Sequence, residues 1–163
     1  MKFLRIILVC LLLCLFFRQA SAQAGSLDNA VGLRLGYSPG ITFQHYVSDE
    51  NAFQFILASR YRGWSVTALY EWHYPAFDVD GLQWFAGGGG HLGFYSWYAD
   101  HPWWDESYTG SRAVIGVDGI LGLEYFIGNT PFMVALDWKP AFNLIGFNGF
   151  IGDNGALSVR YRF

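Results

Sequence analysis

The sequence predicts an all-β chain whose eight antiparallel strands close into an up-and-down barrel. The first observation is the end of the chain, where Leu157, Val159, Tyr161 and Phe163 alternate with polar side chains. The second is that seven earlier segments repeat this period of two. The third is composition, since 20% of the residues are aromatic and twenty are glycine. A free terminal strand with one apolar face invites aggregation, whereas a strand that closes a barrel leaves no free edge.

The first residues are typical of an export signal. A basic start precedes twelve apolar residues, Ile6–Phe17, and small residues follow at Ala20 and Ala22. Twelve helical residues reach about 18 Å, which is too short for a hydrocarbon core of about 30 Å. We therefore expect residues 1–22 to be a cleaved signal peptide and 23–163 to be the barrel domain. A short membrane anchor is the alternative.

Composition excludes several classes of function. Both cysteines, Cys10 and Cys14, lie in the expected signal peptide, so residues 23–163 hold no disulfide and no cysteine-ligated metal. Those residues carry seven Lys and Arg against thirteen Asp and Glu, a net charge of −6. No basic patch is available to neutralise phosphates, so nucleic acid is not expected as a partner.

Eight segments alternate apolar and polar side chains. Their approximate spans are 29–37, 40–47, 52–61, 63–73, 82–95, 113–127, 131–139 and 155–163. In the first four, the apolar faces carry Leu33 and Leu35, Ile41 and Phe43, Phe53 and Phe55, and Val66 and Tyr70. The opposite faces of these four include Arg34, Arg60, Glu71 and His73. His45 falls on the apolar face of the second segment, which is therefore less regular.

The later segments follow the same pattern with one interruption. The fifth contains four consecutive glycines, residues 87–90, without the helix start and Lys-Ser or Lys-Thr of a phosphate-binding loop. A strand kink or close packing in a narrow lumen is the favoured interpretation of these glycines. The polar faces of the last three segments carry Asp118, Glu124, Asp137, Lys139, Arg160 and Arg162.

The lengths of the connections predict that the two ends of the barrel differ. Tight-turn sequences near 48–51, 76–81 and 128–130 fall on the side of the chain termini. On the opposite side, 96–112 and 140–154 are expected to be long loops, while the connections near 38–39 and 62–63 are short. Short periplasmic turns with longer external loops are typical of outer-membrane barrels.

Alternation alone does not say which face is inside. A lipocalin-type carrier buries its apolar face, whereas a membrane barrel turns it outward. Here the polar face carries nearly balanced charge, and aromatic residues gather near the strand ends, as at membrane interfaces. The charged set is Arg34, Arg60, Glu71, Asp118, Glu124, Asp137, Lys139, Arg160 and Arg162. We therefore predict a transmembrane barrel whose lumen is plugged by this charge network; a small gated pore is the alternative.

The closing segment 157–163, together with 31–37, 70–73 and 136–140, makes the chain resemble the small OmpA/OmpX-like barrels of Gram-negative outer membranes. The resemblance implies an integral outer-membrane protein that is surrounded by lipid and acts as a monomer. It also implies insertion by the barrel-assembly machinery, which would read the final strand through Leu157, Val159, Tyr161 and Phe163. The resemblance implies no particular activity.

Two kinds of functional residue are considered in this barrel, contact residues of the loops and catalytic residues. Aromatic residues of the expected external loops are candidates for contact with an extracellular ligand or host surface, or else belong to the outer aromatic girdle. They are Trp103, Trp104, Tyr108, Phe142, Phe147 and Phe150. A lipid A-modifying enzyme needs a Ser, a His and an acid together at the outer rim. The four histidines are scattered and have no metal-ligand spacing, so we expect no enzyme, no cofactor and no metal.

Overall fold

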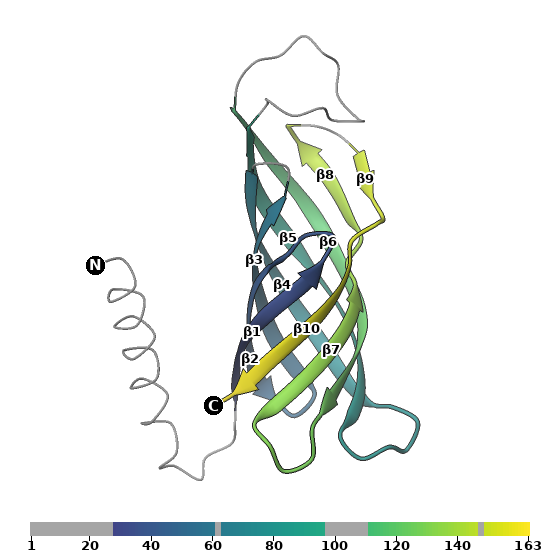
Figure 1. The fold of residues 1–163 in the computed structure, drawn as a ribbon. Coiled ribbons are helices and arrows are strands. Elements are labelled where there is room, and N and C mark those ends of the chain that lie inside the picture. Colours follow the sequence, from purple (N-terminus) through teal and green to yellow (C-terminus); the bar gives the residue numbers. More distant parts are fainter. Residues whose placement is uncertain (1–27, 61–62, 97–110, 147–148) are drawn as a thin grey trace, which may run out of the picture.

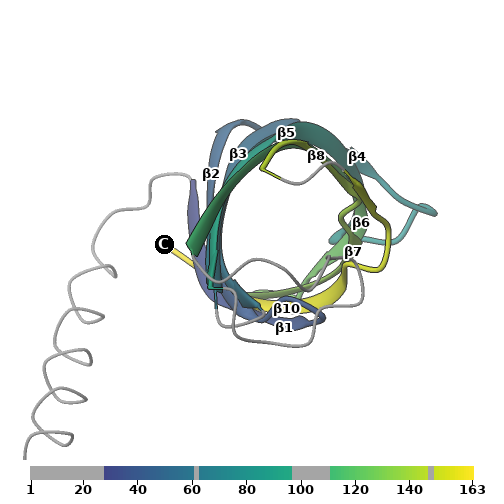
Figure 2. The same cartoon turned by 90° about the horizontal axis from the view of Figure 1, so that it is seen from above.

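The computed structural model describes residues 28–60, 63–96, 111–146 and 149–163. Within these ranges the chain forms one antiparallel sheet, which closes on itself where β5 pairs with β6. Figures 1 and 2 show the resulting cylinder from the side and from above. The strands are β1 (Asn29–Gly36), β2 (Gly40–Ser48), β3 (Asn51–Arg60), β4 (Gly63–Pro75), β5 (Leu82–Ser96), β6 (Ser111–Phe126), β7 (Phe132–Trp138), β8 (Ala141–Ile145), β9 (Gly149–Ile151) and β10 (Gly155–Arg162). Across the described ranges, no helix is long and apolar enough to span a bilayer.

The ten strands make eight passes of the barrel wall, because two passes are interrupted. β7 and β8 both pair with β6, and β9 and β10 pair with β8 and β7 in turn. Pro140 lies between β7 and β8 and has no N–H to give to the ladder, yet its carbonyl still accepts a hydrogen bond from the Gly119 N–H at 2.9 Å. The predicted eight-stranded barrel is therefore confirmed, and each predicted segment matches a strand to within two residues at either end.

The expected long loop over 140–154 is wrong. Most of it is the β8–β9 hairpin, in which Phe142 faces Phe150 across the strand pair. Ala141 and Asn143 point inward and are buried, whereas Phe142 and Leu144 are exposed on the outer face, so the period of two continues past Pro140. The proline, asparagine and glycine residues of this segment suggested a loop because they are uncommon inside strands. Phe142 and Phe150 consequently lie on the barrel wall.

Several predictions fall on residues outside the described ranges. The signal peptide, residues 1–22, is among them and stays a prediction. Trp103, Trp104 and Tyr108 lie in the segment 97–110, and Phe147 lies in 147–148, so no position is assigned to these four candidate contact residues.

The two faces of the sheet differ in the sense that the sequence predicted. Leu136 on the outer face is 62% exposed, whereas Arg34 and Arg160 on the inner face are each 1% exposed. The barrel therefore carries its apolar side chains outward and its charges inward, which is the polarity of a membrane barrel and the reverse of a lipocalin. His45 is exposed on the outer face, as expected, and its ring lies 2.9 Å from the Asn29 side-chain oxygen.

The glycine run of β5 allows close approach to β4. A Cβ atom at Gly89 would come within 1.9 Å of the Ala68 carbonyl oxygen, and one at Gly87 would come within 3.0 Å of Glu71 Cγ. The absence of a side chain at Gly87 therefore leaves space for Glu71 on the inner face, and its absence at Gly89 lets β5 lie close to Ala68 of β4. This geometry agrees with the close-packing interpretation.

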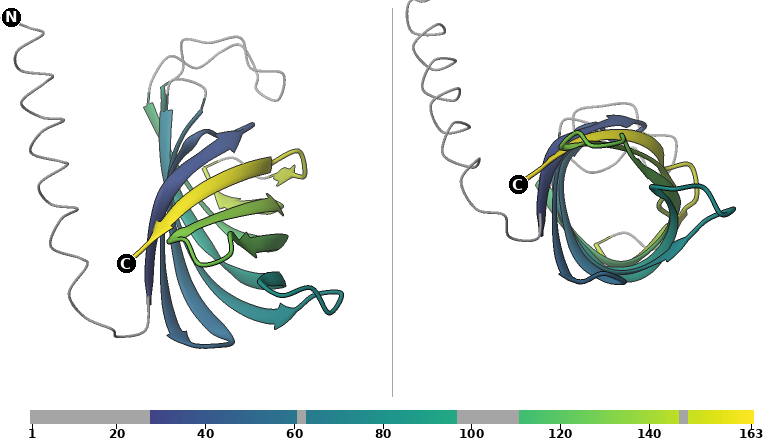
Figure 3. Two further views of the ribbon diagram at one scale, coloured as in Figure 1. Left: turned by 60° about the horizontal axis from the view of Figure 1, so that its bottom comes forward. Right: turned by 90° about the horizontal axis from the view of Figure 1, so that it is seen from below.

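The two ends of the barrel are built differently. The C-terminus lies at the same end as the turns that join β2 to β3, β4 to β5 and β6 to β7, which Figures 1 and 3 show at the lower end of the cylinder. The β8–β9 hairpin lies at the opposite end, above the end of β1. Backbone hydrogen bonds from Asn29 to Phe163 and from Arg162 to Pro131 fix the terminal strand in place.

Candidate functional site

The candidate site is the polar interior of the barrel. Alternate residues of every long strand project into it, and the charged ones come from β1, β3, β4, β6, β7 and β10 and from Lys139, which follows β7. The structure places all nine charged residues that the sequence selected on this inner side. Seven of them belong to three groups along the axis, while Arg60 lies at the upper rim and Arg162 at the lower rim.

The first group lies nearest the chain termini and joins Glu71, His73, Glu124 and Arg160. The His73 Nδ1 atom is 2.9 Å from Glu124 Oε1, and its Nε2 atom is 3.5 Å from Glu71 Oε2. Arg160 Nη1 lies 3.4 Å from Glu124 Oε2. Two carboxylates thus face one arginine and one histidine, and the group is neutral when His73 carries a proton. All four side chains are fully buried.

Uncharged side chains complete the hydrogen bonding of this group. Gln44 donates to Glu71 Oε2 at 3.0 Å and accepts from Arg160 at 3.1 Å. The Tyr46 hydroxyl donates to Glu124 Oε1 at 2.9 Å. The ring of His73 stacks on Phe85, with the ring centroids 5.4 Å apart and the planes 22° apart. Because buried charges are tolerated when they are paired and hydrogen-bonded, these contacts allow the ions to stay in the lumen.

The second group is the ion pair of Arg34 and Asp137. Arg34 projects from β1 and Asp137 from β7, and the Arg34 Nη1 atom donates to Asp137 Oδ2 at 2.5 Å. Both strands flank β10, so the pair spans the inner face of the C-terminal strand. Arg34 Nε and Nη2 and Asp137 Oδ1 are buried without a hydrogen-bond partner.

The third group centres on Asp118 of β6. One carboxylate oxygen accepts from Lys139, and the other lies 2.6 Å from His91 Nδ1. The other ring nitrogen of His91 is 3.0 Å from the Asn143 side-chain oxygen. His91 therefore bridges β5 to β6 and β8, at the level where Pro140 interrupts the seventh pass.

Each end of the lumen carries an arginine that lies over an aromatic ring. At the upper rim, Arg60 lies 3.7 Å from the centroid of the Tyr37 ring and 3.4 Å from Asp153 Oδ2. At the lower rim, Arg162 lies 4.5 Å from the centroid of the Phe126 ring. These contacts join neighbouring parts of the wall at both rims through cation–π attraction.

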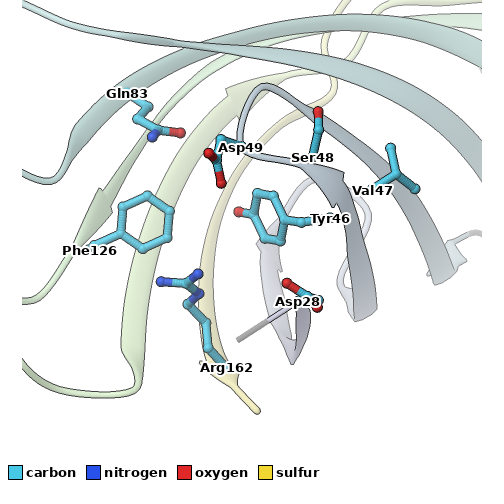
Figure 4. A pocket seen from close by; sticks show the side chains of 8 residues that line it. All are labelled: Asp28, Tyr46, Val47, Ser48, Asp49, Gln83, Phe126 and Arg162. Atoms are coloured by element: carbon cyan, nitrogen blue, oxygen red, sulfur yellow. The ribbon is translucent and has the colours of Figure 1, made fainter. Parts of the chain in front are cut away.

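The lower rim encloses a recess of about 550 Å³. Figure 4 shows the side chains around it, with Arg162 directed between Tyr46 and Phe126. The residues that line it are Asp28, Tyr46, Val47, Ser48, Asp49, Gln83, Phe126 and Arg162. Because Tyr46 lines this recess and also donates to Glu124, it connects the recess to the first ion group.

No protein-family model matches the sequence, and no curated protein matches it. Among solved structures, the crystal structure of the N-terminal β-barrel domain of Pseudomonas aeruginosa OprF is similar, with a TM-score of 0.62 and 12% sequence identity. The match covers 83% of this chain and 95% of that domain. The chain has an OmpA-like barrel fold. At this identity the similarity shows the fold and carries no information about the lumen contacts.

Sequence reasoning missed several polar residues inside the OmpA-like barrel. His73 was placed on the polar face but given no role, and His91 was considered only among the scattered histidines. Gln44 and Tyr46 were missed because His45 made the second segment irregular, although both follow the inward parity of that strand. Asp153, the partner of Arg60, was missed because it was assigned to a loop.

The four residues selected as an assembly signal lie on the last strand of the OmpA-like barrel. Leu157, Val159 and Phe163 are exposed on the outer face, and the Tyr161 ring meets Phe132 edge-on at 5.5 Å. Their reading by the assembly machinery stays a prediction. Within the described ranges, no group of three or more His, Cys, Asp or Glu side chains is arranged to hold a metal ion.

Proposed function

We propose that the protein is an integral outer-membrane barrel with a structural or cell-surface role and a lumen closed by its own side chains. The observation that carries the proposal is the first ion group. Side chains from β4, β6 and β10 meet there across the lumen, because His73 contacts both Glu71 and Glu124, and Glu124 also contacts Arg160. Eight strands enclose a space that side chains can fill, so such a group acts as a plug.

The outer surface supports the membrane location. Large apolar side chains are exposed all around the wall, including Leu33, Leu57, Leu121, Leu136 and Leu157. In water such a surface would promote aggregation, whereas lipid is the favoured environment for it. Export by the 1–22 signal and insertion by the barrel-assembly machinery belong to the same proposal.

Conductance tests the closed lumen. The protein without residues 1–22 is refolded in detergent, its heat-modifiable mobility is checked, and it is inserted into a planar bilayer. A lumen filled by ion pairs passes no large, steady current at neutral pH. A steady open state in most insertions would contradict the plug and favour a pore.

Epitope labelling of intact cells tests the role at the cell surface. We propose that the segment 97–110, with Trp103, Trp104 and Tyr108, and the β8–β9 hairpin, with Phe142 and Phe150, face the outside and contact an extracellular ligand or host surface. An epitope inserted within 97–110 should be labelled on intact cells, while one inserted within 76–81 should be labelled only after lysis. Glycan or cell-adhesion binding that is unchanged by replacing both upper segments would contradict the contact role.

A further inference from the structure

Six buried apolar side chains form one cluster inside the lumen, between the first and the third ion group. They come from five neighbouring strands, β3 to β7, and we call them the apolar layer: Ile56, Ala58, Leu69, Phe85, Ile120 and Ala135. None of the six is more than 7% exposed. Along β6, Ile120 stands between Asp118 of the third group and Glu124 of the first. Along β4, Leu69 lies on the same face as Glu71 of the first group and two residues before it.

The glycine run of β5 makes room for the apolar layer. Gly87 pairs with Ile120, and Gly89 pairs with Leu69. Neither glycine places a side chain on the inner face between the two flanking strands. Cα atoms of β4 and β6 come within 8 Å of each other, although β5 lies between these strands. Leu69 and Ile120 therefore pack over β5 within one cluster.

The rest of this cross-section is polar but closed to water. Ala135 of the layer pairs with Ser158 of β10, and Ser158 pairs with Arg34 of β1. Among the described residues, Ser158 Oγ, Arg34 Nε and Nη2, and Asp137 Oδ1 have no hydrogen-bond partner, and they are buried so completely that a water molecule does not reach them. Water that could enter would bind such atoms, because leaving them unpaired is costly. The apolar layer and these atoms therefore make one dry section across the lumen.

The dry section separates two spaces of the lumen. The recess at the lower rim, with Tyr46 in its wall, lies on the side of the first ion group. On the other side, Ile56 and Ala58 line a cavity of about 40 Å³ together with Asp118 of the third group. No residue lines both spaces. An ion that entered the section between them would lose its hydration water and meet no polar partner in the apolar layer.

We propose that the apolar layer is the part of the lumen that excludes ions, and that the charges of the first ion group are not needed for this. The inference rests on the closed lumen proposed above and names the side chains that determine its impermeability. Charged side chains can exchange one another for a passing ion, whereas an apolar constriction offers an ion nothing in return for its water. The ion groups fill the lumen on either side, and Leu69 and Ile120 carry the barrier between them.

Planar-bilayer recording of substituted proteins tests this inference. The double change Leu69→Ser with Ile120→Ser opens the layer and leaves every charge in place, so we expect a steady current where the unmodified protein passes none. Met133→Ser is the matched control, because Met133 is fully buried in the lumen beside Tyr46 but lies outside the layer. Glu124→Gln keeps the volume of the first ion group and removes its central charge. Both of these variants should stay closed.

Thiol labelling tests the layer without removing its bulk, and it keeps the test decisive if the double serine variant does not fold. Residues 23–163 contain no cysteine, so Ile120→Cys adds a single thiol and keeps a small apolar side chain in the layer. A charged methanethiosulfonate reagent should label it at least about a hundredfold more slowly than Gln83→Cys, because labelling inside the layer requires local opening of the barrel. Gln83 lines the lower recess and is open to solvent.

The outcomes separate this inference from the closed lumen itself. A steady current through the unmodified protein would overturn the closed lumen and this inference with it. A closed unmodified protein together with a conducting Glu124→Gln or Met133→Ser variant would overturn the apolar layer alone. So would a folded double serine variant that passes no current, or equal labelling of Ile120→Cys and Gln83→Cys.

Discussion

Glu124 holds three partners at once, since His73, Arg160 and Tyr46 all contact its carboxylate. Its neighbour Glu71 depends on His73 and Gln44 in the same way. At the scale of single residues, each buried charge of this group therefore depends on its neighbours for its ion pairs and hydrogen bonds. A buried ion pair adds little stability compared with a well-packed apolar core, but removing one partner leaves the others charged and unpaired.

The first prediction concerns that central carboxylate. Glu124→Gln preserves volume but removes the charge that Arg160 and His73 face, so the free energy of unfolding should fall by about 3–5 kcal/mol. Urea titration in lipid vesicles, followed by tryptophan fluorescence, measures the change. Asp49→Asn, at the exposed β2–β3 turn, is the control and should shift stability by less than about 0.5 kcal/mol. A loss below about 1 kcal/mol at Glu124 would mean that the group is weakly coupled.

The β4–β5 turn shows strain at the scale of elements. Phe77 and Asp78 both have positive φ, 55° and 53°, and the Val79 N–H donates to the Ala76 carbonyl at 3.2 Å. This is a two-residue turn of the type that favours Asn-Gly, because only small or short polar residues adopt that backbone without strain. Phe77 is also 81% exposed, so its ring contributes little packing.

The second prediction follows from this strain. The double change Phe77→Asn with Asp78→Gly should raise the free energy of unfolding by about 1–2 kcal/mol, because it relieves two left-handed residues. The same urea titration measures it. Asp49→Gly is the matched control: Asp49 has no positive φ, so glycine there should be neutral or mildly destabilising. If both changes raised the free energy of unfolding equally, the cause would lie in the unfolded chain and not in relief of strain in the β4–β5 turn.

The strand order and the inner and outer faces of the barrel could be predicted from the sequence, because the alternation within each strand shows which of its side chains share a face. Leu136 and Trp138 alternate with Asp137 whatever the neighbouring strand is, so the inward face can be recognised locally. The ion partners could not be predicted, because they depend on the register between strands far apart in the chain. Arg34 meets Asp137 across 103 residues, and that meeting is fixed by β10, which pairs with both of their strands.

The β8–β9 hairpin was missed for a different reason. Pro140 and several glycines suggest a loop in any local reading, and the outward Phe142 and Leu144 were too few to outweigh them. In the barrel, β6 continues past its pairing with β7, and the chain after Pro140 pairs with it again as β8. Tertiary pairing thus overrides local preference in this segment. The same misassignment hid Asp153, because its ion pair with Arg60 depends on the β9–β10 connection.

The whole molecule depends on the polarity of its wall. A barrel in lipid and a barrel in water share topology, but they respond oppositely to a charge on the outer face. The third prediction uses Leu136, in the interior of β7 and 62% exposed. Leu136→Arg should lower stability in vesicles by about 2–4 kcal/mol if this position lies near the bilayer midplane. On a surface in water the same change would cost less than about 0.5 kcal/mol.

Phe77→Arg is the control for the third prediction, because this residue lies in the turn between β4 and β5 at the end where the chain terminates. It should leave stability in vesicles nearly unchanged. Comparable small effects at Leu136 and Phe77 would contradict the membrane location of the wall.

We propose that the last residue of this sequence acts on assembly more than on stability. Phe163 is exposed on the outer face, and its backbone bonds with Asn29 do not involve the side chain. The fourth prediction is that Phe163→Ala leaves the free energy of unfolding of the refolded protein within about 1 kcal/mol. In cells it should reduce the heat-modifiable, folded fraction in the outer membrane if the assembly machinery reads the final strand, as we propose.

Phe132→Ala is the matched change for the fourth prediction. Phe132 is also an exposed aromatic residue, and it lies beside Tyr161 on the neighbouring strand β7, so it alters the same rim without altering the last strand. Its folded fraction in cells should follow its stability in vesicles. If Phe163→Ala and Phe132→Ala lose folded protein in cells equally, the terminal residue carries no separate signal, and closure of the barrel by β10 is a property of strand pairing alone.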